Sequence, residues 1–263
     1  MTFAAKNTEE VSERQLSKVP QVTLIFWVIK ILCTTLGETG GDAVTMSMNL
    51  GYLVGTAIFA AVFIVFVVAQ VYGKRFHPLL YWATIIATTT VGTTMADYAD
   101  RSLGIGYAGG SLILLGLLLA SLGAWYWTMG SVSVHSVSSH KTEIFYWVTI
   151  MFSQTLGTAL GDWTADSEGL GYLGGVAIFA GLLVAVAACH FWTKISKTLL
   201  FWAAFILTRP LGAVVGDLLD KPLDHGGLDL SRYTASATLI VLVIVGIFLF
   251  PQRAGEYQAK QEG

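Results

Sequence analysis

The sequence predicts an all-α integral membrane protein with eight transmembrane helices, arranged as four parallel-oriented two-helix repeats. Composition is the first reason: of 263 residues, 54% are hydrophobic and only 12% are charged, and the mean hydropathy is +0.66. These values lie far from those of a soluble domain of similar length. The second reason is a set of eight apolar runs, each near the ~20 residues needed to cross a bilayer. The third is one motif that occurs four times.

The apolar runs divide the chain into two membrane halves. They cover residues 22–42, 50–72, 79–99, 105–127, 143–164, 170–192, 198–219 and 232–250. We therefore expect a polar tail at 1–20, a first half at 21–130, a linker at 131–142, a second half at 143–251 and a tail at 252–263. The first tail lacks the apolar core and cleavage site of a secretory signal. Cys33 and Cys189 lie in apolar runs, where small buried side chains are expected rather than a disulfide.

The motif begins with an aromatic-Trp pair, followed ten residues after the Trp by Gly and fifteen residues after it by Asp. The Trp, Gly and Asp residues of the four copies are Trp27, Gly37 and Asp42; Trp82, Gly92 and Asp97; Trp147, Gly157 and Asp162; and Trp202, Gly212 and Asp217. Each copy contains two spans, so all four enter the membrane in the same direction, unlike odd-span inverted repeats. We expect pseudo-fourfold symmetry about the membrane normal. A small residue four after each Gly allows the lead helices to pack closely as an inner ring.

The distribution of Lys and Arg predicts the orientation. The tails and even-numbered loops carry ten of them: Lys6, Arg14, Lys18, Lys74, Arg75, Lys141, Lys194, Lys197, Arg253 and Lys260. The odd-numbered loops carry only Arg101, Lys221 and Arg232. The positive-inside rule then places both termini in the cytoplasm, and we expect a multi-pass protein of the bacterial inner membrane. Each Asp would lie about 22 Å from its Trp, in the outer half of the membrane.

Four acids at one depth indicate a shared site, because a charged side chain near the bilayer centre costs several kcal/mol. The predicted ligands of a metal ion are Glu38, Asp42, Asp97, Asp162 and Asp217. On the same helix faces, Thr34, Thr89, Gln154 and Arg209 would line a path, and Asp100 and Asp220 would form an outer mouth. So many close carboxylates require cations or shared protons. The alternative is that the acids pair across the bundle and only hold it together.

The ligand types predict which ion would bind. Carboxylate, hydroxyl and carbonyl oxygens suit hard ions such as Mn²⁺, Mg²⁺ or Ca²⁺, whereas Zn²⁺ and Cu⁺ prefer His and Cys. No His lies on these helix faces. Arg209, next to Pro210, would act as a gate that blocks cations, or would be a static partner of Glu38 or of a neighbouring Asp.

The repeated phrases resemble a known family. Residues 34–42 (TTLGETGGD), 155–162 (TLGTALGD) and 207–212 (LTRPLG) are similar to bacterial membrane-anchored proteins built from four copies of a short repeat of unknown function. This resemblance implies a fold but no activity. Glu38, Gly41 and Asp42 are also loosely similar to the Glu-x-Gly-Asp signature of Golgi-type calcium/manganese cation/proton exchangers, although their spacing differs by one residue.

We therefore expect a transporter that exports a divalent cation, Mn²⁺ favoured, in exchange for protons. The cation would be the transported substrate, and no permanently bound cofactor is expected. The expected partners are the lipid bilayer, the cation and protons, and no nucleic acid. One alternative is a non-transporting anchor or sensor. A further alternative is an intramembrane aspartyl protease, whose Gly-x-Gly-Asp motif Asp162 and Asp217 match only in part. Four equivalent acids exceed the two that such chemistry uses, so an enzyme is not expected.

Overall fold

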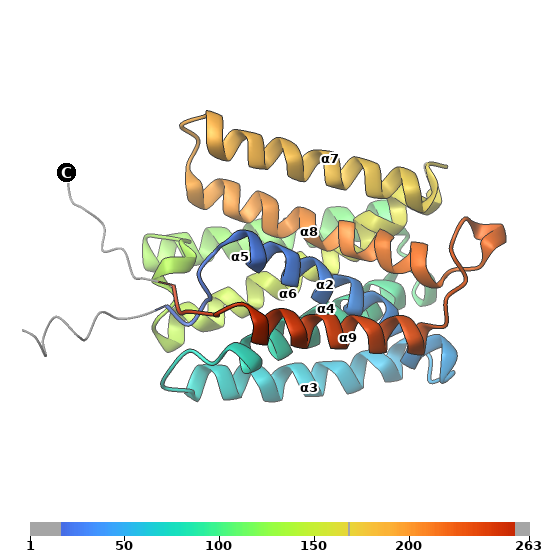
Figure 1. The fold of residues 1–263 in the computed structure, drawn as a ribbon, viewed down its shortest axis with the longest axis horizontal. Helices are drawn as coiled ribbons and strands as arrows, with labels where there is room; N and C mark the ends of the chain where they lie inside the picture. Colours follow the sequence, from blue (N-terminus) through green and yellow to red (C-terminus); the bar gives the residue numbers. More distant parts are fainter. Residues whose placement is uncertain (1–16, 168, 256–263) are drawn as a thin grey trace, which may run out of the picture.

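The structure, a computed structural model, describes residues 17–167 and 169–255, which are almost entirely helical (Figure 1). Within these residues, eight long α-helices lie roughly along one direction: α2 (Leu24–Asp42), α3 (Tyr52–Tyr72), α4 (Pro78–Asp97), α5 (Tyr107–Met129), α6 (His140–Asp162), α7 (Gly171–Trp192), α8 (Lys197–Asp220) and α9 (Arg232–Leu249). A π-helical turn continues each of α2, α4 and α6: Ala43–Ser47, Tyr98–Ser102 and Trp163–Ser167. Two short 3₁₀ turns are Val134–Ser136 and Leu223–His225.

The helix bounds confirm the all-α prediction. Each helix matches one of the eight predicted apolar runs to within three residues at either end. The π turns were not predicted. The predicted tails at 1–20 and 252–263 lie mostly outside the described residues, and so do Lys6, Arg14 and Lys260.

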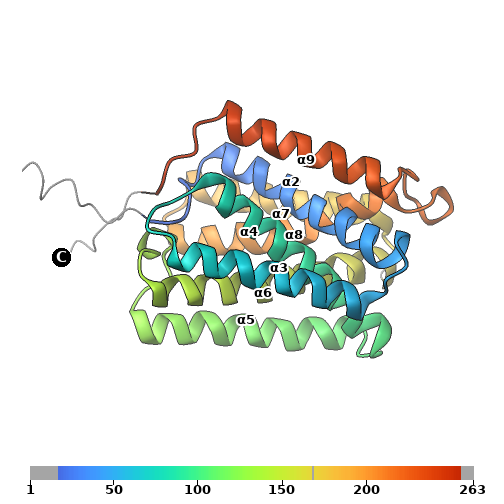
Figure 2. The same ribbon diagram turned by 90° about the horizontal axis from the view of Figure 1, so that it is seen from below.

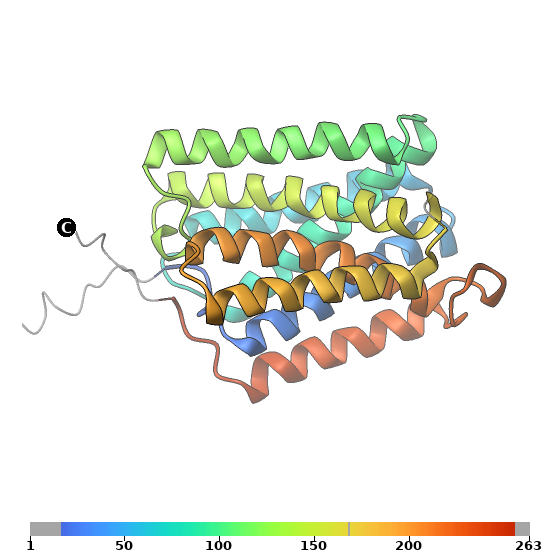
Figure 3. The ribbon, with the colours of Figure 1, turned by 90° about the horizontal axis from the view of Figure 1, so that it is seen from above.

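The lead helices of the four repeats form a closed inner ring. Helix α2 packs against α4, α4 against α6, α6 against α8, and α8 against α2 again. The second helix of each repeat packs against the lead helix of the next: α3 on α4, α5 on α6, α7 on α8 and α9 on α2 (Figures 2 and 3). The ring is therefore held together by every consecutive pair of repeats, including the last and the first.

Six helices are long and apolar enough to cross a membrane: α2 with its π turn, α3, α5, α7, α8 and α9. The outer helices expose large apolar side chains such as Ile64, Leu112 and Val184, as expected for a surface in contact with lipid. The chain is thus a membrane protein. Helices α4 and α6 are not among the six, because α4 carries six Thr and α6 carries Thr, Ser and Gln along its length. Both belong to the enclosed inner ring, where polar side chains avoid lipid.

Glycines make the close contacts between neighbouring lead helices. A methyl group at Gly37 would overlap the Thr89 side chain, one at Gly157 would overlap Arg209, and one at Gly212 would overlap Thr34. At Gly92 it would lie only 3.0 Å from the backbone carbon of Gln154. In each case the Gly of one lead helix receives the residue that lies eight positions before the Asp of the next. The repeat motif therefore encodes the helix–helix contact that small residues allow in membranes.

The two ends of the ring differ in chemistry. One end is an aromatic layer in which Phe26, Tyr81, Trp82 and Tyr146 are at most 1% exposed, and the hydroxyls of Tyr81 and Tyr146 lie 2.6 Å apart. The described chain ends also lie here, where Pro20 and Ala254 form an isolated β-bridge (Figure 1). Helices α2, α4 and α6 each finish at their motif Asp at the opposite end. The aromatic layer closes the ring beneath the carboxylates.

Substituting Gly92 tests the packing. A Gly-to-Ala change inside a helix normally stabilises it by about 0.5–1 kcal/mol, which we expect for Gly116→Ala in α5, where nothing lies within 4 Å. Gly92→Ala should instead lower the free energy of unfolding by about 1–3 kcal/mol, because backbone atoms of α6 must move. Thermal unfolding in detergent, followed by Trp fluorescence, measures both variants. Equal effects at the two glycines would disprove the close contact.

Candidate functional site: a buried carboxylate network

The predicted acids converge at one end of the inner ring. Glu38, Asp42, Asp97, Asp162 and Asp217 are each at most 3% exposed. One carboxylate oxygen from each of Glu38, Asp162 and Asp217 lies within 4.8 Å of the other two, and the same holds for Asp42, Asp217 and Asp220. Asp217 belongs to both groups and joins them. Four helix ends therefore bring acids that are far apart in sequence into one buried cluster.

Arg209 forms the inner boundary of this cluster. Its side chain is fully buried, and its Nη2 atom lies 3.0 Å from Glu38 Oε2. The same nitrogen donates to the hydroxyl of Thr93 at 2.5 Å and to that of Thr158. Nη1 donates to the carbonyl of Thr34 at 3.4 Å. One guanidinium thus contacts all three other lead helices, and Glu38 is its carboxylate partner.

Two basic residues bridge neighbouring repeats at the outer boundary. Arg101 lies four residues after Asp97 and contacts both that side chain, at 3.0 Å, and Asp162, at 3.3 Å. Lys221 lies four residues after Asp217 and contacts it at 3.0 Å, and it also pairs with Asp42.

These two bridges are equivalent in the sequence. A shift of 120 residues converts Asp97 and Arg101 of one bridge into Asp217 and Lys221 of the other, and the same shift relates their cross-repeat partners, Asp42 and Asp162. The bridges join repeat 2 to repeat 3 and repeat 4 to repeat 1. The two halves of the chain therefore make the same kind of contact.

The two predicted mouth residues differ in environment. Asp220 is only 5% exposed and lies 3.1 Å from Arg232 Nε and 3.8 Å from Lys221 Nζ, so it belongs to the buried network. Arg232 also lies 3.8 Å from Asp42. Asp100 is partly exposed, and its Oδ1 atom faces Gly110. Burial raises the pKa of Asp100. Only one of the two acids thus shares the ion pairs of the site.

The network contains more acids than bases. Six carboxylates (Glu38, Asp42, Asp97, Asp162, Asp217 and Asp220) share four cations (Arg101, Arg209, Lys221 and Arg232). Six negative and four positive charges leave a formal charge of −2. Asp42 Oδ1 and Asp162 Oδ1 are buried without a hydrogen-bond donor or ion-pair partner in the described part of the chain. Two equivalent oxygens are thus available to a ligand.

The bridging bases keep their charge. Burial lowers the pKa of Lys221, but Asp217, Asp42 and Asp220 outweigh it and raise that pKa well above its usual 10.5. Burial likewise opposes the charge of Arg101, while Asp97 and Asp162 raise its pKa. Because the raised pKa values belong to the folded state, the charges of the two bases contribute fully below their usual pKa and are lost only under strongly alkaline conditions. At neutral pH, Lys221 and Arg101 are therefore both charged and offset two of the six carboxylates.

The residues predicted to line a path lie below the acids and are fully buried. Thr34 donates to the carbonyls of Ile31 and Thr208, and Thr89 donates to that of Cys33 at 3.4 Å. Gln154 has no hydrogen-bond partner for either side-chain polar atom in the described residues. The threonines fill the glycine contacts between helices, so this layer is closed in the present conformation.

Sequence reasoning missed four basic residues of the site. Arg101, Lys221 and Arg232 were counted only as charges of the outer loops. The available signal was the spacing of four residues after Asp97 and Asp217, which places a base and an acid on one helix face. Lys30 was also missed: it is fully buried in α2, 3.4 Å from Thr208 Oγ1 and 4.0 Å from the centre of the Phe205 ring. Lys30 and Arg209, both fully buried, therefore lie on the aromatic side of the acids.

Replacing Lys221 tests the network. Lys221→Met leaves Asp42 and Asp217 buried without their main partner, which should cost about 3–5 kcal/mol of unfolding free energy at pH 8. Buried, unpaired carboxylates have raised pKa values in the folded state, so lower pH protonates them and the deficit should shrink by pH 5. Chemical or thermal unfolding at both pH values measures the effect. Lys194→Met, at an exposed position of the α7–α8 connection, is the control and should change little. A pH-independent deficit would argue against carboxylates as the cause.

Comparison with known proteins gives one family. The family described as "Repeat of Unknown Function (DUF347)" matches residues 25–76, 80–131, 145–196 and 200–254, which are the four repeats of the motif. Searches of curated proteins and of solved structures gave no match. The similarity to cation exchangers that the first repeat suggests therefore has no support among the comparisons. The chain belongs to the DUF347 family, with four copies of its repeat.

Proposed function

We propose that all eight long helices cross the membrane and that the four repeats are related by pseudo-fourfold symmetry. The supporting observations are the repeated contact of each glycine with the next lead helix and the equal placement of α3, α5, α7 and α9. Helices α4 and α6 would cross as enclosed members of the ring. The excess of Lys and Arg at the aromatic end favours cytoplasmic termini, in a bacterial inner membrane.

We further propose that the protein transports a hard divalent cation, with Mn²⁺ favoured, in exchange for protons and in the direction of export. The observation that carries this proposal is the buried network of six carboxylates and four bases. One divalent cation or two protons would balance its formal charge of −2. All available ligand atoms are oxygens, which suit Mn²⁺, Mg²⁺ and Ca²⁺.

Glu38, Asp162 and Asp217 would form the ion site, since three of their oxygens already lie within 4.8 Å of one another. A bound ion would draw on the free oxygen of Asp162, and Asp42 and Asp97 would complete the surrounding charge. Protons would occupy the carboxylates when the ion leaves. This exchange needs no permanently bound cofactor and no nucleic acid.

Arg209 would separate the site from the aromatic end. Its buried positive charge lies on the way out of the acid cluster, which opposes the passage of a cation. Pro210 interrupts the hydrogen bonding of α8 beside it, so this helix is suited to bending. Movement of α8 would carry Arg209 away from Glu38 and open the path along Thr34, Thr89 and Gln154.

The rival proposal is a non-transporting anchor or sensor whose acids only hold the bundle together. Its support is that every acid of the network has a basic side chain within 4.0 Å. The acid excess and the free oxygens of Asp42 and Asp162 favour transport over this rival. An aspartyl protease is less favoured still, because its two acids share a proton, whereas here Asp162 and Asp217 contact Arg101 and Lys221.

Ion flux tests the transport proposal. We expect purified protein in liposomes to carry Mn²⁺ when a proton gradient is applied, and Asp162→Asn or Asp42→Asn to lower the rate by roughly tenfold or more, about 1.4 kcal/mol of barrier. Mg²⁺, Ca²⁺ and Zn²⁺ assayed in parallel give the selectivity.

Asp166→Asn is the matched control, because Asp166 is an exposed acid four residues after Asp162 that accepts a hydrogen bond from Tyr107. It should transport like the wild type. Unchanged flux in both network variants would rule out the mechanism. Absence of flux for every ion in the wild type would favour an anchor or sensor, and cleavage of a peptide would favour the protease.

A further inference from the structure

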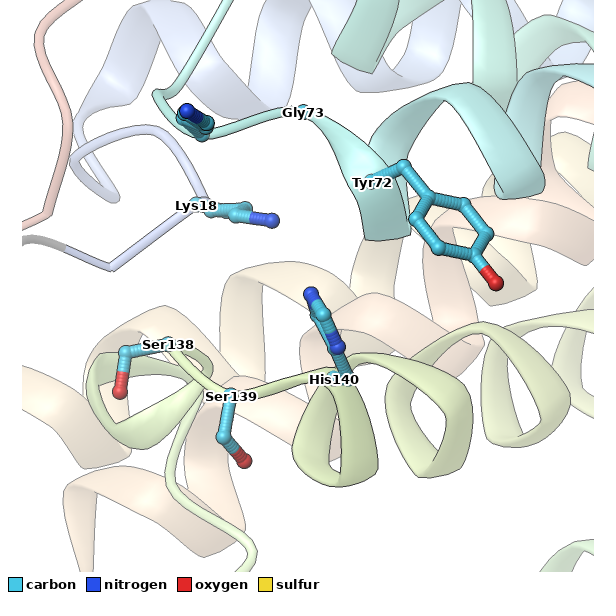
Figure 4. A pocket seen from close by; sticks show the side chains of 7 residues that line it. Lys18, Tyr72, Gly73, Ser138, Ser139 and His140 are labelled. Carbon is cyan, nitrogen blue, oxygen red and sulfur yellow. The ribbon is translucent and has the colours of Figure 1, made fainter.

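An open surface cavity of about 400 Å³ lies at the aromatic end of the bundle, far along the helices from the carboxylates. It opens between the end of α3 and the start of α6, and Lys18, Tyr72, Lys74, Ser139 and His140 are among its lining residues (Figure 4). Neither the family nor the proposed transport assigns this cavity a role.

Basic side chains line part of the cavity. Lys18 is held in place, with Nζ 2.6 Å from Glu143 Oε1 and 3.0 and 3.2 Å from the carbonyls of Gln70 and Val71. Glu143 is 1% exposed, so its carboxylate pairs with Lys18 and is not presented to the cavity. Lys74 is exposed, and His140 stands beside the Tyr72 ring, at 5.9 Å between centroids. The exposed ammonium of Lys74 and the imidazole N–H of His140 can both donate to an anion.

Hydroxyl groups complete the polar lining. The hydroxyls of Ser138 and Ser139 lie on the α6 side of the cavity (Figure 4). Ser139 already accepts a hydrogen bond from the backbone N–H of Thr142 and caps α6. Its hydroxyl also lies 3.1 Å from Thr142 Oγ1, so the Ser138 hydroxyl is the one whose hydrogen can donate to an acceptor. Cations and hydroxyls together are the donors that a phosphate group prefers.

Apolar surface continues directly from the cavity. On α3, Val68 lies one turn before Tyr72, and on α6, Ile144 and Val148 lie one and two turns after His140; these three side chains are 39–52% exposed. Helices α3 and α6 contact each other, so their exposed faces adjoin. Tyr72 itself is 75% exposed at the boundary, a position typical of aromatic side chains at the membrane interface. The polar cavity thus lies above a surface suited to acyl chains.

We propose that this cavity binds the headgroup phosphate of an anionic phospholipid, whose acyl chains lie along the joined faces of α3 and α6. The charge selects an anionic lipid over a zwitterionic one, and the apolar surface selects a lipid over free phosphate. Basic residues next to a membrane surface each contribute about 1 kcal/mol toward anionic lipid, which is about fivefold in affinity. The proposal does not depend on what the carboxylate network transports.

Native mass spectrometry of the full-length protein tests the proposal, with phosphatidylglycerol or phosphatidylcholine added in detergent. The wild type should hold one phosphatidylglycerol more tightly than phosphatidylcholine. Lys74→Gln combined with His140→Gln should weaken phosphatidylglycerol binding at least fivefold and leave phosphatidylcholine binding unchanged. The variant's melting temperature without added lipid should match that of the wild type, because Lys74 is exposed and His140 lies at the helix start.

Lys194→Gln is the matched control, since it removes an exposed cation at the same end of the bundle. It should bind phosphatidylglycerol like the wild type. Equal losses in the control and the double variant would show attraction to the whole face rather than to this cavity. Equal binding of the two lipids, or full displacement of phosphatidylglycerol by inorganic phosphate at constant ionic strength, would overturn the proposal.

Discussion

The structure depends on keeping a group of acids inside a membrane protein. An unpaired charge in such a place is costly, so each carboxylate must be protonated, paired or bound to a cation. Arg101, Arg209 and Lys221 meet most of this requirement by contacting acids of neighbouring repeats. Because the same contacts join the lead helices, the ion pairs that balance the charge also hold the helices together. Six carboxylates and four bases leave two formal negative charges unbalanced.

The packing of the ring and the chemistry of the site share residues. Gly157 accommodates the stem of Arg209, whose guanidinium then reaches Glu38, Thr93 and Thr158 on three different helices. A larger residue at Gly157 would displace this cation from the acids. The fourth repeat differs from the others at this position, with Arg where they have Thr or Gln. One asymmetric residue in a repeated framework therefore sets the inner boundary of the site.

Much of the fold could be predicted from the sequence, because apolar length and a fixed Trp, Gly and Asp spacing define the helices and their common register. The convergence of the acids followed from that register. The ion pairs between repeats did not follow from it: Arg101 lies in the π turn after α4 and Lys221 lies just beyond α8, and their reach to Asp162 and Asp42 depends on how neighbouring repeats pack. Lys30 was hidden for a different reason, since no equivalent residue exists in the other repeats.

We propose that mobile charge, a metal ion or protons, neutralises the acid excess. Calorimetric titration of the full-length protein with Mn²⁺, repeated in buffers of different ionisation enthalpy, counts the protons released per bound ion. Metal binding to carboxylates that carry protons releases them, so the account predicts saturable binding with release of up to about two protons. Binding without proton release, or no binding at all, would show that the fixed bases already satisfy the network and would contradict the account.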